Sequence, residues 1–428
     1  MTKSLLIHGT IVHTIDNKLE VIEGGYIAVK DGMITEISRT PIEGDFQLVE
    51  TTKTQLIIPG LIDTHIHAPQ YVFAGCGLDL PLLQWLEKYT FPAETKFASV
   101  EHAKKVYEAV VSRTLTHGTT TACYFATIWT ESSHLLSKIC REHGQRAFVG
   151  KVSMDRNSPP TYCEETKKAI DSAKEFVNQY PVDDDLVQPI ITPRFVPTCT
   201  PELMLALSEI QTHRPSTLIQ SHVSENLGEI AWVQSLHPEC ENYCDVYRKY
   251  GLLGPKTILA HGVHLTDDEL KMLNATGGAI AHCPSSNFQL FSGACDIRRL
   301  QKAGVKVGLG TDVAGGPSPS MIDAMRNALI CSRSNLFLKR EKGEDYVPLT
   351  VPEVLALATE GGAKALGIDD KVGNFVVGKQ FDALIVDLTK GVCDCFGEES
   401  IGDLLDKFVH RGDDRNVVTV YVKGKQVK

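Results

Sequence analysis

Eight short runs of β-type residues alternate with helical segments through the middle of the chain. Apolar residues at helical spacing fill most of the segments between these runs. Strands that alternate with helices pair in parallel, and eight such strands are enough to close a barrel. We therefore expect a (β/α)8 TIM-type barrel, with a doubly wound open sheet as the alternative. The runs are 56–65, 118–126, 146–153, 187–193, 216–222, 257–261, 278–282 and 305–310.

Both ends of the chain carry β-type runs that are separated by turns, whereas those in the middle of the chain are separated by helical segments. Near the N-terminus, residues 24–29 and 33–34 flank Asp31-Gly32, a dipeptide typical of a hairpin turn. Residues 382–387 and 417–424 show the same pattern of short β-type runs near the C-terminus. We expect the two ends to pair into one small β-sandwich domain beside the barrel. The expected domains are residues 1–58 with 372–428, and residues 59–371.

Composition limits the classes of partner. The chain has 428 residues, 43% of them hydrophobic, and a formal net charge of −10. Nucleic acids and anionic membranes select basic surfaces, so neither is an expected partner. The apolar run Leu5–Ile7 is too short for a secretory signal, and no run approaches the roughly 18 residues of a membrane span. The twelve cysteines are scattered in a chain too long to need disulfides, so we expect a cytoplasmic protein with a small-molecule substrate.

Polar residues stand at the C-terminal ends of several β-type runs. The first run ends in His65-Ile66-His67, and residues i and i+2 of a strand point to the same side, so both imidazoles can hold one ion. Alone, such a pair is weak evidence for a metal site, because two histidines at this spacing can simply be polar residues at a strand end. However, further runs end in His222, His261 and Asp312. Because barrel enzymes build their sites at this edge, we expect a metal site there.

Glu225 and Asp312 each have a structural alternative. Glu225 precedes a predicted helix that begins near Asn226, where an acidic group stabilises the helix dipole. Its position three residues after His222 favours a catalytic role instead. Asp312 has the sequence context of a helix N-cap before Gly315-Gly316, but its place at a strand end favours a metal ligand.

Four motifs follow one another along the chain: Pro59-Gly60-Leu61-Ile62-Asp63-Thr64-His65-Ile66-His67, Ser221-His222-Val223-Ser224-Glu225, His261-Gly262 and Gly310-Thr311-Asp312. With these motifs in this order, the chain resembles the amidohydrolase superfamily over essentially its whole length. Within that superfamily, Gln70, Pro193-Arg194-Phe195, His222-x-x-Glu225 and the segment His282–Asn287 resemble the members that deaminate guanine.

The resemblance implies one zinc ion per chain. It further implies that His261 lies beside the metal-bound water or loosely on the metal, and that iron is the alternative metal. Relatives with two metals bridge them with a carboxylated lysine on the fourth strand. The segment Val187–Arg194 contains no lysine, which favours a single ion. The implied ligands are His65, His67, His222 and Asp312.

The resemblance also implies a reaction, the hydrolysis of guanine to xanthine and ammonia. Hydroxide adds to C2 of the base, Asp312 or His261 accepts the proton of the water, and Glu225 passes a proton to N3. The insertion Leu78–Lys96 is expected to overhang the barrel mouth as part of a lid. Family members are commonly homodimers. The residues expected at the purine base are Gln70, Arg194, Phe195, His222, Glu225, Trp85 and Leu83.

Several of these assignments keep an alternative. Arg194 follows a strand at its mouth end but is also compatible with a surface arginine, and Phe195 is either a stacking wall or a core residue. Trp85 and Leu83 are equally ambiguous. At the level of function, the alternatives are a deaminase of another heterocycle, of the 8-oxoguanine or S-adenosylhomocysteine type, a triazine hydrolase, or a non-catalytic scaffold.

Overall fold

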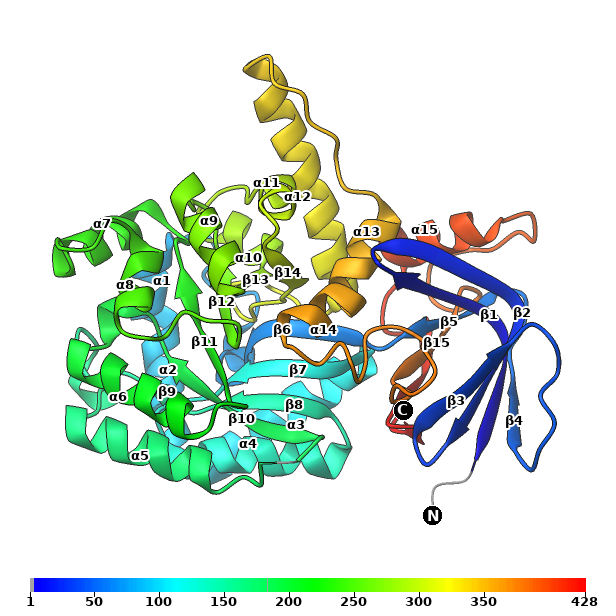
Figure 1. The fold of residues 1–428 in the computed structure, drawn as a ribbon, viewed down its shortest axis with the longest axis horizontal. Helices are drawn as coiled ribbons and strands as arrows, with labels where there is room; N and C mark the ends of the chain where they lie inside the picture. Colours follow the sequence, from blue (N-terminus) through cyan, green and yellow to red (C-terminus); the bar gives the residue numbers. More distant parts are fainter. Residues whose placement is uncertain (1–3, 183) are drawn as a thin grey trace.

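The chain forms two sheets, one from the middle of the sequence and one from its two ends (Figure 1). The computed structural model describes residues 4–182 and 184–428. Residues 1–3 of the expected terminal domain therefore lie outside the described part. Among the described helices, none is both long and apolar enough to cross a membrane.

The middle of the chain forms the predicted barrel. Its main strands pair in parallel in sequence order, and the two-residue strand β9 (Val152–Ser153) extends the pairing with β10. Several hydrogen bonds connect the last strand region to the first. Among them, Asp312 N donates to His65 O at 2.9 Å, and Thr64 Oγ1 donates to Leu309 O at 2.8 Å. The barrel prediction is confirmed. The strands are β6 (Leu61–His67), β7 (Thr119–Phe125), β8 (Arg146–Gly150), β10 (Val187–Pro193), β11 (Leu218–Val223), β12 (Thr257–His261), β13 (Ala279–His282) and β14 (Lys306–Leu309).

The first predicted run, 56–65, is two strands rather than one. Its first part, β5 (Gln55–Pro59), belongs to the terminal sheet, and the barrel begins at β6. The chain passes between the sheets at Gly60, whose N–H donates to Asp382 O at 3.0 Å. A Cβ on Gly60 would lie 2.1 Å from Oγ1 of Thr120, so the crossing needs a glycine. The apolar pattern alone does not reveal this break.

Strands from both ends of the chain pair in the second sheet, as predicted. β5 pairs antiparallel with β15 (Ala383–Asp387), and this pairing joins the N-terminal strands to the C-terminal ones. Asp31 and Gly32 form the predicted two-residue turn, with φ values of 50° and 80°. The other strands are β1 (Leu5–Ile15), β2 (Lys18–Lys30), β3 (Met33–Ser38), β4 (Gln47–Glu50), β15 (Ala383–Asp387), β16 (Val417–Val422) and β17 (Lys425–Gln426).

Helices follow the barrel strands, and most occupy the predicted segments. Local sequence explains their ends: in α9 (Asp267–Thr276) the side chains of Thr266 and Glu269 form a capping box, and Gly277 ends the helix with φ 74°. The sequence prediction missed α8 (Tyr243–Lys249), which begins after the N-cap Asn242. The predicted helices are α3 (Val100–Thr116), α4 (Thr130–His143), α5 (Thr166–Asn178), α6 (Pro201–His213), α7 (Leu227–Leu236), α9 (Asp267–Thr276) and α11 (Ile297–Lys302).

Candidate metal centre and substrate pocket

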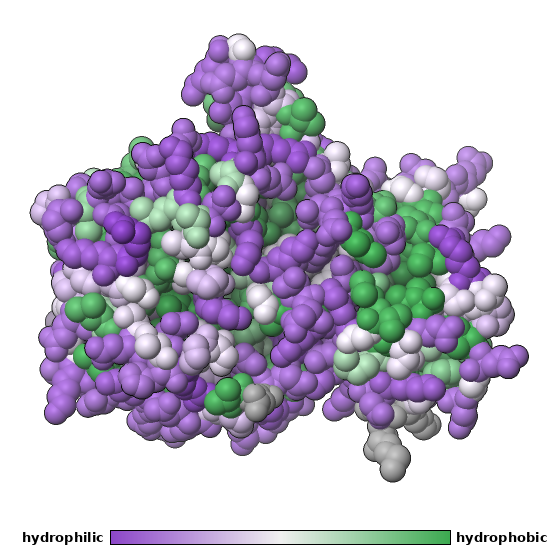
Figure 2. Space-filling view, viewed as in Figure 1, coloured by the Kyte–Doolittle hydropathy of each residue, from purple (hydrophilic) through white to green (hydrophobic). Residues whose placement is uncertain are grey.

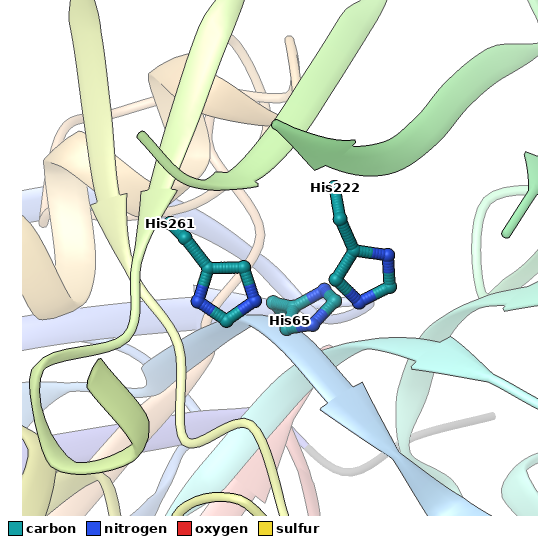
Figure 3. Close-up of side chains that lie close together, drawn as sticks. All are labelled: His65, His222 and His261. Carbon is teal, nitrogen blue, oxygen red and sulfur yellow. The ribbon is translucent and has the colours of Figure 1, made fainter. Parts of the chain in front are cut away.

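Four histidines and one aspartate meet at the C-terminal ends of the barrel strands. His65 and His67 lie at the end of β6, His222 lies on β11, His261 ends β12, and Asp312 follows β14. Figure 3 shows the rings of His65, His222 and His261 gathered around one point. The backbone turns sharply here, because His261 and Asp312 have φ values of 78° and 47°, which residues other than glycine rarely adopt.

The side-chain atoms of this cluster are close enough to share one ion. His65 Nε2 and His67 Nε2 lie 3.2 Å and 3.4 Å from Asp312 Oδ1, and His67 Nε2 lies 3.2 Å from His222 Nε2. The ligand atoms of His65, His222 and His261 also lie within 4.8 Å of one another. His65 Nε2 is buried and has no hydrogen-bond partner among the described residues. This set of nitrogen and oxygen donors fits a single zinc or iron ion.

Burial keeps His67 and His222 in the neutral form that binds metals. The pKa values of His67 and His222 are lowered well below the ordinary value, first by burial and then by the neighbouring histidines. Burial opposes ionisation of Asp312, but His65, His261 and His67 hold the pKa of that carboxyl below its ordinary value. Neutral imidazoles beside an ionised carboxylate are the protonation states that metal ligands need.

Hydrogen bonds behind the cluster fix how the imidazole rings are oriented. His222 Nδ1 donates to the backbone O of Arg194 at 2.6 Å, and His261 Nδ1 donates to Asn287 Oδ1 at 2.9 Å. The Nε2 atom of each ring therefore faces the centre with a free lone pair. The sequence prediction gave Asn287 no such role, although it lies in the motif that carried the resemblance.

Glu225 lies inside the site. It is 3% exposed, and its Oε2 lies 3.3 Å from His261 Nε2. Burial, together with the nearby Asp312, raises the pKa of Glu225 well above its ordinary value, which favours a protonated carboxyl group. The helix-end role belongs to Glu229, which forms the capping box with Asn226 at the start of α7.

One pocket opens directly onto the cluster. The insertion 78–96 forms α1 (Leu82–Trp85), η2 (Leu86–Thr90) and α2 (Phe91–Thr95), and α1 and η2 contribute to its wall. Leu83 is half-buried and lies outside the set of lining residues, where its neighbour Leu82 stands instead. The lining residues are His67, Gln70, Leu82, Trp85, Leu86, Arg194, Phe195, His222, Glu225, His261, Leu290 and Asp312.

Glu94 connects two of the expected substrate residues. Its carboxylate is fully buried and accepts hydrogen bonds from Arg194 Nη1 at 2.6 Å, Arg194 Nη2 at 3.2 Å and Gln70 Nε2 at 2.9 Å. Burial alone would lower the pKa of Arg194, but the Glu94 carboxylate raises it above its ordinary value. Arg194 is therefore held as a cation in the pocket wall.

Comparison with known proteins assigns the family. Residues 56–427 match the amidohydrolase family. The chain belongs to this family. It is 46% identical to a guanine deaminase of Dictyostelium discoideum over 99% of this chain and 98% of the relative, and 46% identical to a guanine deaminase of Mus musculus over 99% and 96%. A crystal structure of guanine deaminase from C. acetobutylicum with bound guanine in the active site is 35% identical, covers 99% of this chain and 100% of the other, and has a TM-score of 0.94.

Most of the expected site residues of this amidohydrolase come together in one place, and the sequence missed one of their main partners. The pocket brings Gln70, Arg194, Phe195 and Trp85 to the same cavity as the metal-ligand candidates other than His65. Glu94 could not be singled out, because nothing in the sequence of the insertion distinguishes it from a solvated helix residue. Its role becomes visible only when the insertion lies against the end of β10.

Proposed function

We propose that this amidohydrolase hydrolyses guanine to xanthine and ammonia. The observation that carries the proposal is one pocket whose wall contains the metal-ligand candidates other than His65, together with Glu225, Arg194 and Gln70. The metal-ligand candidates provide for a nucleophile, Glu225 provides for proton transfer, and Arg194 and Gln70 provide hydrogen-bond donors. The full-length similarity to guanine deaminases supports the same substrate.

We propose one zinc ion per chain, held by His65, His67, His222 and Asp312, with His261 beside it. When bound, the metal lowers the pKa of water and so supplies a hydroxide nucleophile at neutral pH. The absence of lysine from β10 and its following residue Arg194 supports one ion rather than a lysine-bridged pair. Elemental analysis of protein purified without added metal distinguishes zinc from iron.

Glu225 is the proton carrier in this proposal. While the oxygen of water adds to C2 of guanine, Asp312 or His261 accepts a proton from that water, and the Glu225 carboxyl protonates N3. Glu225 then takes up the proton held by Asp312 or His261 and gives it to the C2 amino group, which leaves as ammonia. The hydroxyl group on C2 returns its proton to Glu225, and xanthine remains. Its distance of 3.3 Å from His261 Nε2 supports proton exchange between the two groups.

Arg194 and Gln70 determine which base fits. Guanine presents acceptors at O6 and N7, and the Arg194 guanidinium has only donors to offer. Adenine carries an amino donor at position 6, where guanine has O6, so it would set donor against donor in a buried site. Adenine also has no amino group at C2. Phe195 and Trp85, 6% and 2% exposed, provide apolar walls for the ring.

We propose a homodimer that forms through α12 (Met321–Glu341). This helix stands out from the barrel in Figure 1, and apolar surface shows on its flank in Figure 2. Ile330, Phe337 and Leu338 are 50%, 59% and 51% exposed, and their spacing places them on one side of the helix. Light scattering on the native chain and on an F337E variant tests this, and a monomeric native chain would contradict it.

We further propose a cytoplasmic location. All twelve cysteines are free, and most of them are buried, which supports a compartment that keeps thiols reduced. Cell fractionation followed by immunodetection of the native chain tests the location, and recovery in a secreted fraction would contradict it.

A substrate panel tests the proposed reaction. Ammonia release is measured from guanine, adenine, cytosine, 8-oxoguanine and S-adenosylhomocysteine with metal-loaded protein. Guanine should exceed adenine in kcat/KM by roughly 10⁴ or more, because the buried donors reject a mismatched edge. A preference for 8-oxoguanine or S-adenosylhomocysteine would assign another ring system, and release from none of them would favour a non-catalytic scaffold.

A further inference from the structure

Glu94 is a buried acid on the lid segment, and it lies behind the substrate pocket rather than in it. Its carboxylate is fully buried, and it is absent from the residues that line the pocket. A buried carboxylate is costly unless cations and hydrogen-bond donors surround it. Glu94 receives three such hydrogen bonds, all from Arg194 and Gln70. The lid segment is therefore anchored to the barrel by two residues that face the substrate.

The contact with Glu94 fixes the orientation of the Gln70 side chain. Gln70 Nε2 donates to Glu94 Oε1 at 2.9 Å, while Gln70 Oε1 accepts from Ala314 N at 3.1 Å. A carboxylate has no donor, so it accepts only the NH₂ end of the amide. The second N–H of Gln70 is thereby kept as a donor, and a rotated amide would lose both bonds.

The same carboxylate fixes Arg194. Both Nη atoms donate to Glu94, and the ring of Phe91, also on α2, lies 5.3 Å from the guanidinium carbon. Phe91 and Glu94 together hold the plane of the guanidinium group. In the described part of the chain, the Arg194 side chain hydrogen-bonds to Glu94 alone, so it retains donors for a ligand in the pocket that it lines.

We propose that Glu94 is a positioning residue that turns Gln70 and Arg194 into one fixed array of hydrogen-bond donors. This array selects a ligand edge made of acceptors, and it is complete only when α2 lies against the end of β10. The base is therefore recognised only when the lid segment is docked on the barrel. The inference rests on the proposed function, because it assigns Arg194 and Gln70 to the purine base.

The experiment compares E94Q with the parent protein, both metal-loaded. An amide in place of the carboxylate cannot accept from Gln70 and both Nη atoms of Arg194, because one end of it is a donor. We expect KM for guanine to rise at least tenfold and kcat/KM to fall by about 10², the loss typical of a misplaced recognition group. Binding of xanthine, measured by calorimetry without turnover, should weaken about tenfold, and metal content should not change.

The matched control is D382N. Asp382 makes a second buried carboxylate–arginine pair, with Arg146, at the opposite end of the barrel. D382N should lower the melting temperature but leave KM for guanine and xanthine affinity unchanged within about twofold, since surface and structural sites far from a ligand do not orient it. If D382N raises KM as much as E94Q does, the effect of E94Q is general destabilisation and the positioning role is wrong.

E94D covers the case in which E94Q does not fold. It keeps the charge but is one methylene shorter, so it cannot reach both partners, and kcat/KM should fall at least tenfold. Unchanged KM, kcat/KM and xanthine affinity in a folded E94Q or E94D protein would overturn the positioning role of Glu94 but not the proposed function. A parent protein that releases no ammonia from guanine would instead overturn the proposed function.

Discussion

Two buried arginine–carboxylate pairs lie at opposite ends of the barrel and serve different purposes. Arg146 begins β8 and meets Asp382, which precedes β15 of the terminal sheet, with Nη2 to Oδ2 at 3.2 Å. Arg194 follows β10 and meets Glu94 of the lid segment at 2.6 Å. Both pairs attach a separate segment to a barrel strand, and the side chains in each are at most 4% exposed.

The two pairs differ in whether the arginine keeps hydrogen-bond donors that the protein itself does not use. Arg146 also donates to Gln380 Oε1 and to the backbone O of Asp185, so its hydrogen-bonding capacity is used within the protein. Among the residues that the structure describes, the Arg194 side chain has the Glu94 carboxylate as its only hydrogen-bond partner, and it lines a pocket. The same chemistry therefore joins the terminal sheet to the barrel at one end and leaves donors for a ligand at the other. In barrels of this type the C-terminal end carries chemistry and the N-terminal end carries stability.

The largest effect is expected from D312A, which removes a ligand candidate from the C-terminal end. Metal and activity should be lost together, with ammonia release down by at least about 10³, because the metal contributes several kcal/mol to the reaction. Elemental analysis and an ammonia assay on the same sample check this. Full turnover in a metal-free D312A protein would place the chemistry elsewhere.

E225Q separates proton transfer from metal binding. The amide keeps the shape of Glu225 but cannot carry a proton, so turnover should fall by at least about 10² while metal content stays that of the parent. Circular dichroism confirms that the variant is folded. Activity near that of the parent would leave Glu225 with a structural role only.

Replacing each arginine by alanine tests the comparison itself. R194A should lower kcat/KM for guanine by about 10² per metal-loaded molecule, because the base loses its orientation. R146A should cost about 3 to 5 kcal/mol in the free energy of unfolding, since it leaves Asp382 uncompensated, and should leave kcat/KM near the parent value. R194A also leaves Glu94 unpaired, so both variants are compared at a temperature at which they are folded. Equal effects of the two substitutions on kcat/KM would remove the distinction.

The smallest effect is expected from Leu83, a residue of the lid segment that lies outside the pocket. L83A should change kcat/KM by less than about threefold, as is usual for a partly exposed residue outside the pocket. W85A should raise KM at least tenfold, because the loss of a buried aromatic wall leaves a cavity beside the base. Trp85 is 2% exposed, whereas Leu83 is half-buried. A larger loss of kcat/KM in L83A than in W85A would mean that the lid segment lies over the pocket in a different register.

Sequence reasoning predicted the elements with a strong period and missed features that depend on distant contacts. The strand ends at His261 and Asp312 were predictable because apolar runs stop there. The division of the first run at Gly60 was not, because it depends on the side chain of Thr120 from another strand. Glu94 was missed for a similar reason: its partner Arg194 lies 100 residues away in sequence.

Metal removal and restoration test the central claim most directly, namely that the C-terminal end of the barrel is a single-metal guanine deaminase site. Ammonia release from guanine is measured on native, chelator-treated and zinc-restored protein. We predict that the treated protein is inactive and that activity returns in proportion to bound zinc, reaching the native rate at about one ion per chain. Turnover of guanine by the metal-free protein, or a requirement for two ions, would contradict the account.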